Sequence, residues 1–142
     1  EFSVEWEISD VTFNDGAAFS SETFNTTVMV LKINKNIPVF AMEKEGIIEK
    51  IFDRVIAFTG HKDIDFEMYP DFSKKFLVTG NEETKIRSFF TEGLISFFEN
   101  KQIYHLESNG EGLIIFDKIK LARTDETIAL IDYSKELVKL LH

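Results

Sequence analysis

Residues 102–117, QIYHLESNGEGLIIFD, decide the fold class. They place the pair Asn109-Gly110 between two runs rich in apolar residues. This pair is the strongest short-range signal of a β-hairpin, because a tight turn between paired strands needs positive φ angles. We therefore expect antiparallel strands over residues 102–107 and 112–117. Residues 112–116 are apolar without alternation, which predicts a strand covered on both faces.

Three further strands are expected in the N-terminal third of the chain. Residues 2–8 alternate between apolar and polar side chains, which is the period of a strand with one buried face. The alternation changes phase at residues 11–13, so we expect a β-bulge near Ser9. Residues 26–33 are rich in β-branched side chains and predict a second strand, and a short third strand begins at Pro38.

Helical patterns separate the groups of strands. Residues 47–56 place their apolar side chains on one helical face. A second helix is expected after Asn81, whose side chain suits the N-cap position, with a restart at Thr91. Thr124 is expected to cap a last helix that runs to about residue 141, with acidic residues at its start and lysines toward its end.

Residues 61–68 hold an acidic row that is the best candidate for a metal site. In a strand, alternate residues project to one side with Cα atoms about 6.5–7 Å apart, whereas metal ligands converge within about 2–2.5 Å of the ion. We therefore interpret the row as the solvent face of a strand that pairs with residues 72–79. A divalent-ion site that recruits His105 or Glu107 is the alternative. The row consists of His61, Asp63, Asp65 and Glu67.

Two other features invite a functional interpretation. His105 and Glu107 share one face of a strand, and such a pair can act as acid and base, but no nucleophile accompanies it, so we interpret it as a cross-strand polar pair. The pairs Phe89-Phe90 and Phe97-Phe98 have helical spacing, so at least one member of each faces the core. An exposed second member would mark an interface, and a phenylalanine-lined cavity would indicate a carrier of small apolar ligands.

Composition and charge limit the classes of function. The chain has 142 residues, 44% of them hydrophobic and 15 of them phenylalanine, which suffices for the core of one domain. It has no cysteine, which excludes disulfides, thiolate metal sites and a cysteine nucleophile. The net charge is −9, and every charged residue before Lys32 is acidic, so nucleic acid and anionic lipid are disfavoured as direct partners.

Residues 71–82, DFSKKFLVTGNE, and residues 86–94, IRSFFTEGL, resemble a pattern found in an uncharacterised family of bacterial proteins, domain of unknown function 3137. The resemblance covers about residues 63–117 and consists of packing and turn positions. The resemblance implies that this chain is the soluble part of a membrane-anchored protein and lies on the cytoplasmic side of the membrane. The family has no known catalytic residues that could be assigned to this chain. The start at Glu1, inside a strand pattern, fits a piece of a longer chain.

These patterns predict a single α+β domain over residues 1–142. Its sheet is mostly antiparallel and built from hairpins, with three or four helices packed on it. No catalytic residue, cofactor site or resident metal is identified. We expect a non-enzymatic protein-interaction or scaffold domain of a bacterial membrane-associated protein, which meets the membrane only through segments outside this chain. The alternatives are a divalent-metal-dependent binding or hydrolytic domain that uses His61, Asp63 and Asp65, and the apolar-ligand carrier.

Overall fold

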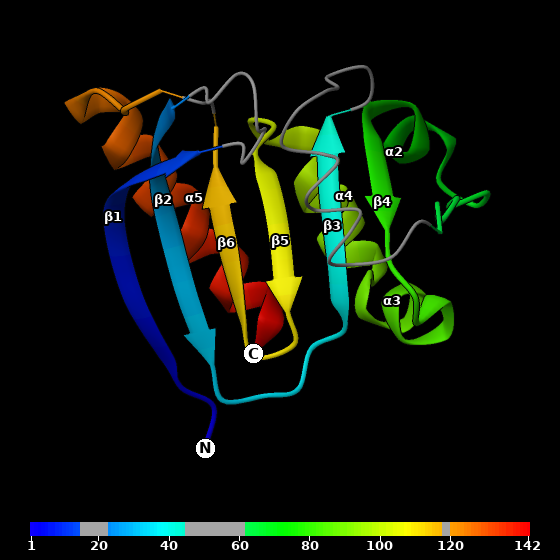
Figure 1. The fold of residues 1–142 in the computed structure, drawn as a ribbon. Coiled ribbons are helices and arrows are strands. Elements are labelled where there is room, and N and C mark those ends of the chain that lie inside the picture. Colours follow the sequence, from blue (N-terminus) through cyan, green and yellow to red (C-terminus); the bar gives the residue numbers. More distant parts are fainter. Residues whose placement is uncertain (15–22, 45–61, 118–119) are drawn as a thin grey trace.

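The computed structural model describes residues 1–14, 23–44, 62–117 and 120–142. These residues form a six-stranded antiparallel sheet with helices packed on it, which confirms the expected α+β fold (Figure 1). The strand order is β1-β2-β6-β5-β3-β4. The strands are β1 (Val4–Asn14), β2 (Thr23–Ile33), β3 (Val39–Lys44), β4 (Phe76–Thr79), β5 (His105–Asn109) and β6 (Gly112–Phe116).

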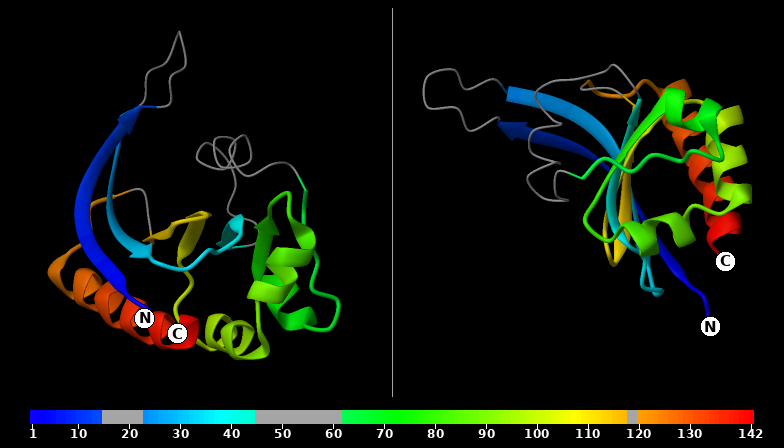
Figure 2. Two further views of the ribbon diagram at one scale, coloured as in Figure 1. Left: turned by 90° about the horizontal axis from the view of Figure 1, so that it is seen from below. Right: turned by 90° about the vertical axis from the view of Figure 1, so that its right-hand side faces the viewer.

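The described helices gather on one side of the sheet (Figure 2). The longest, α5, lies behind β2 and β6, and the others lie toward β4. β1 and β2 curve away from the helix layer, so the opposite face of the sheet is concave. The helices are α2 (Pro70–Lys75), α3 (Glu83–Phe89), α4 (Glu92–Asn100) and α5 (Thr124–Leu141).

The core lies between the sheet and the helices. Alternate strand residues such as Leu31, Phe40 and Leu106 are almost completely buried there, as the period of a strand requires. Aromatic rings from α2, α3 and α4 join them, with Phe72 and Phe90 centroids 5.8 Å apart. Such tilted and edge-to-face ring packing adds to the free energy gained by burying apolar area.

The hairpin prediction is confirmed at β5 and β6. Gly110 has a φ of 96°, a conformation that glycine adopts without steric cost. Ser108 and Asn109 accept backbone hydrogen bonds within the turn. The expected burial of β6 on both faces is wrong at Ile114, which is 40% exposed, because its side chain projects onto the concave face, away from the helices.

The expected bulge near Ser9 is wrong. β1 and β2 pair without interruption from Val4–Ile33 to Asn14–Thr23. The phase change has another cause: Asp10 occupies a position on the helix side of the strand, and its carboxylate accepts a 2.7 Å hydrogen bond from Thr27 Oγ1. Asp10, a hydrogen-bonded polar residue, therefore occupies a position where the alternation of β1 predicts an apolar side chain.

Residues 62–79 also differ from expectation. The predicted strand pair is reduced to a single antiparallel bridge between Asp63 and Thr79. Residues 70–75 form the short helix α2, because proline in the first turn has a helical φ and lacks only an N–H that would be unpaired there. The paired strand begins at Phe76.

The helix starts are mostly as expected. The restart at Thr91 is confirmed, since its hydroxyl accepts a hydrogen bond from Leu94 N at 3.4 Å. The N-cap of α3 is Glu82 rather than Asn81. The N-cap of α5 is Arg123 rather than Thr124, which is the first residue of the helix. The backbone N–H of Arg123 donates to Glu126 Oε2 at 2.9 Å. The predicted helix over residues 47–56 lies outside the described residues.

Candidate functional site

The concave face of the sheet holds a buried cluster of charged side chains. The pairing of β5 with β6 sets His105 opposite Phe116. The register of β3 with β5 pairs Met42 with Leu106, and its next step places Glu43 beside His105. Glu107 follows two positions along β5, on the same face. The neighbouring strands β3, β5 and β6 therefore bring Glu43, His105, Glu107 and Phe116 together.

The cluster is closely hydrogen-bonded. Glu43 Oε1 lies 2.8 Å from His105 Nδ1, and Glu107 Oε1 lies 2.5 Å from His105 Nε2. The side chains of His105 and Glu43 are only 10% and 9% exposed. The ring of Phe116 covers the imidazole, with centroids 4.4 Å apart. The charged groups are thus held under apolar cover.

The two carboxylates favour a protonated histidine. Burial alone disfavours the imidazolium, but the hydrogen bonds and charges of Glu107 and Glu43 outweigh it, so the pKa of His105 is raised. Both ring nitrogens then donate, one to each carboxylate. A neutral imidazole carries a single N–H and would leave one carboxylate facing a lone pair.

This arrangement limits what the cluster can do. Both nitrogens of His105 are engaged, so neither is free to take a proton from a substrate or to bind a metal ion. The contact of His105 with Glu107 is present, but it runs along β5, so the predicted cross-strand pairing of these two residues is wrong. The cross-strand partner is Glu43, the third member, which sequence reasoning missed. Local periodicity carries no information on which strand lies next to β5.

A hollow of about 450 Å³ adjoins the cluster on the same face. Val30 and Ile114 line it, with Glu107, Asn109 and Lys32 around them. Its charged groups have both signs, so charge alone selects no class of ligand for this hollow.

The acidic row is not gathered into a metal site by the residues that the structure describes. Asp63, Asp65 and Glu67 are exposed, whereas the interleaved Ile64 and Phe66 are buried, as the solvent-face interpretation predicts. The interpretation also places Met68 in the core, and this is wrong, because Met68 is 87% exposed just before α2. Partial burial, together with the neighbouring charge of Asp65, raises the pKa of Asp63. Across the described ranges, no group of three or more histidine, aspartate or glutamate side chains is arranged to hold a metal ion. His61, the remaining member of the row, lies outside those ranges.

The segment carrying the row is fastened to α3. Lys62 forms an ion pair with Glu83, and Arg87 donates to the carbonyl oxygen of Asp65 at 2.6 Å. Arg87 also lies over the ring of Phe66, 5.5 Å from its centroid. These contacts explain why an extended segment with one β-bridge keeps a defined position.

The long edge strand β1 is a second candidate surface. Asn34 N donates to Ser3 O, so odd residues of β1 bond to β2, and the N–H and C=O groups of even residues point outward. Trp6 and Ile8 are among these even residues, and their side chains are 43% and 39% exposed. No strand among the described residues pairs with this outward edge, so within that part of the chain it combines unpaired backbone groups with exposed apolar side chains.

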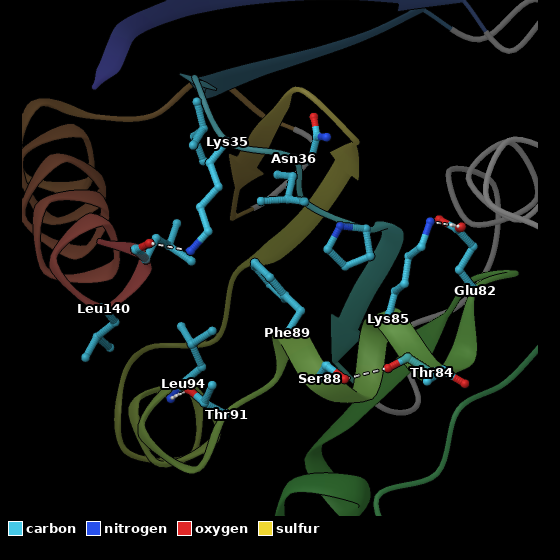
Figure 3. A pocket seen from close by; sticks show the side chains of 14 residues that line it. Lys35, Asn36, Glu82, Thr84, Lys85, Ser88, Phe89, Thr91, Leu94 and Leu140 are labelled. Carbon is cyan, nitrogen blue, oxygen red and sulfur yellow. Dashed lines mark hydrogen bonds and ion pairs between the residues drawn. The ribbon is translucent and has the colours of Figure 1, made fainter. Parts of the chain in front are cut away.

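A third candidate is a pocket of about 540 Å³ at the end of the sheet, shown in Figure 3. It lies between the β2–β3 connection, α3, the start of α4 and the end of α5. Phe89 is its single phenylalanine, and the rest of its apolar lining is aliphatic or proline. The expected phenylalanine-lined core cavity is therefore not this pocket, because the core rings pack against each other.

The phenylalanine pairs leave no exposed second ring. Phe90 is 3% exposed, Phe97 9% and Phe98 2%, and Phe89 is partly buried against Phe40 and the wall of the pocket. Both members of each pair are accommodated because α3 and α4 meet around the ring cluster. The exposed large apolar side chains of the described residues lie elsewhere. They are Trp6 and Ile8 on β1, Met68 before α2, Ile114 on β6, Leu121, and Ile128 and Leu140 on α5.

No protein-family model, curated protein or solved structure matches this chain. Of the helices that the structure describes, none is both long and apolar enough to cross a membrane.

Proposed function

We propose that this chain is a non-enzymatic protein-interaction domain that binds an extended segment of a partner along β1. The observation that carries the proposal is the outward edge of this strand, eleven residues long, with its apolar side chains half exposed. Addition of a strand to such an edge is a recurring mode of peptide recognition, in which the main chain supplies affinity and alternate side chains supply specificity.

β1 lacks several devices that protect sheet edges. Natural edge strands are commonly short, bulged, or interrupted by lysine or proline. β1 contains neither residue and pairs with β2 over its whole length without a bulge. Its charged residues are all acidic, which disfavours pairing with a second copy of β1 and favours a partner of opposite charge.

The two faces of β1 indicate the kind of segment that fits. Trp6 and Ile8 lie on the helix side and call for apolar side chains in the partner. Glu5 and Glu7 lie on the concave side, where Lys32 is paired with Glu5 at 3.6 Å. A segment that alternates basic and apolar residues satisfies both faces, because side chains of a strand alternate between its faces.

The wider setting of the proposal rests on the resemblance over residues 63–117. This resemblance supports the proposal that the chain is a domain of a bacterial membrane-associated protein. In this proposal the domain lies on the cytoplasmic side of the membrane and is tethered through segments outside this chain. The absence of a free nitrogen on His105 supports a binding role over acid–base catalysis.

The test uses Trp6, the single tryptophan of the chain. A synthetic peptide that alternates lysine and valine is titrated while tryptophan fluorescence and amide hydrogen exchange are recorded. We expect an emission shift and slower exchange of the amides of Trp6 and Ile8. A peptide of the same sequence with alternate backbone nitrogens methylated cannot complete the ladder and serves as the control.

Two variants separate strand addition from simple charge attraction. Ile8→Pro removes an outward N–H and is expected to abolish binding, whereas Ile8→Thr keeps the donor and retains most of it. Equal binding of the methylated and unmethylated peptides, or equal binding by both variants, would contradict the proposal.

A further inference from the structure

The pocket at the end of the sheet has an apolar interior. Ile37, Leu94 and Leu141 are buried in its lining, and Phe89 lies at its centre in Figure 3. Leu140 adds an exposed aliphatic wall from the last turn of α5. A volume of about 540 Å³ is within the range of sites that bind small organic molecules.

Two lysines reach the pocket from different walls. Lys35 comes from the β2–β3 connection, and Lys85 comes from α3 (Figure 3). Lys85 is engaged by Glu82 at 2.5 Å. Among the described residues, the single hydrogen bond of Lys35 Nζ is a long contact of 3.4 Å to the carbonyl oxygen of Leu141. Within the described part of the chain, no carboxylate forms an ion pair with Lys35, so its ammonium retains donors for an anion.

The charged residues that line this pocket are mostly basic, whereas the molecule as a whole is acidic. The chain carries a net charge of −9, yet the pocket lining includes two lysines and one glutamate. A positive group above an apolar floor is complementary to a molecule with one anionic end and an aliphatic chain.

We propose that this pocket binds a medium-chain aliphatic carboxylate. The carboxylate accepts hydrogen bonds from Lys35, and the chain lies against Phe89, Leu94 and Leu140. This site is separate from the β1 edge, so it adds a small-molecule ligand to the proposed protein-interaction role.

The probe is decanoate, used below the concentration at which it self-associates. Binding is followed by amide chemical shifts and by titration calorimetry. We expect shifts concentrated at Lys35, Ser88 and Leu140. Butyrate has the same head group with little chain and should bind far more weakly. Decyltrimethylammonium has the chain with the opposite charge and should not bind here.

Matched variants separate the site from general adsorption. Lys35→Gln should weaken decanoate binding about tenfold or more, which corresponds to loss of a hydrogen bond between charged groups. Lys74→Gln removes an exposed lysine on α2, away from the pocket, and should leave binding unchanged. Ser88→Trp fills the pocket from α3 and should abolish binding without affecting peptide binding at β1.

Three outcomes would overturn the proposal. Equal binding of decanoate and decyltrimethylammonium would show apolar adsorption. Equal effects of Lys35→Gln and Lys74→Gln would show general charge attraction. Shifts centred on the concave face or on β1 would place the ligand elsewhere.

Discussion

Glu43 Oε1 lies 2.8 Å from His105 Nδ1, although their strands, β3 and β5, are far apart in the sequence. The contact exists because β3 enters the sheet between β5 and β4. With Glu107 on the other ring nitrogen, the histidine carries its charge between two carboxylates in a buried position. The charge of the His105 side chain therefore depends on the order of the strands in the sheet, because this order brings Glu43 next to it.

The stability of the protein should fall as the pH rises through the pKa of His105. The folded pKa is raised above the value of about 6.5 for an unfolded histidine, so the stabilising contribution is complete below that pH and is lost as the imidazolium deprotonates. Urea unfolding across the neutral to alkaline range measures this fall. The fall should disappear in His105→Gln, and parallel pH curves for the two proteins would refute the assignment.

The titration of His105 should respond to its partners. Glu43→Gln removes one of the two charges that hold the proton, so the pKa of His105 should decrease. The proton on the imidazole Cε1 reports this pKa directly in an NMR titration. Lys44→Gln, next along β3 and exposed, is the control and should leave the midpoint nearly unchanged. An unchanged midpoint in Glu43→Gln would mean that Glu43 does not stabilise the charge.

Replacing one member of the cluster should cost more than replacing all three. Glu43→Met leaves the imidazolium with one buried partner, and breaking a buried ion pair this way costs about 3–5 kcal/mol. The triple variant Glu43→Met, His105→Phe, Glu107→Leu leaves no buried charge at the site. Its free energy of unfolding should exceed that of the single variant, as denaturant melts can show. A triple variant less stable than Glu43→Met would indicate that the cluster contributes net stability.

The two sides of β1 should respond differently to proline. Ile8 directs its N–H outward, whereas Ser9 donates to β2 within the ladder. Ser9→Pro should therefore destabilise the protein by about 1–3 kcal/mol more than Ile8→Pro, because it removes a ladder bond and leaves a carbonyl without its partner. Chemical denaturation of both variants tests the edge assignment independently of any ligand. Equal losses would place β1 away from the edge of the sheet.

Some features set by neighbouring residues were predictable from the sequence, although the predicted bulge near Ser9 and the predicted N-cap at Asn81 were wrong. Features set by strand order were not predictable from local patterns. The turn at Asn109-Gly110 and the helix start at Thr91 depend on local conformational preference, and both are present. Glu43 joins His105 only through the pairing of β3 with β5, which no local pattern specifies. The short helix α2 was not predictable, because a proline such as Pro70 suits both a turn and a first helical turn.

A pair of glycines offers a matched test of close packing in the sheet. A Cβ atom on Gly112 would lie 2.5 Å from the carbonyl oxygen of Leu31, so Gly112→Ala forces β2 and β6 apart. We expect a loss of about 1–3 kcal/mol. Gly93, in α4, has open space around its Cβ position, with Thr91 Oγ1 the nearest atom at 3.9 Å. Gly93→Ala should instead stabilise the protein by up to about 1 kcal/mol through helix propensity. Thermal and urea unfolding of the two variants should therefore shift in opposite directions, and a neutral Gly112→Ala would show that β2 and β6 do not approach this closely in solution.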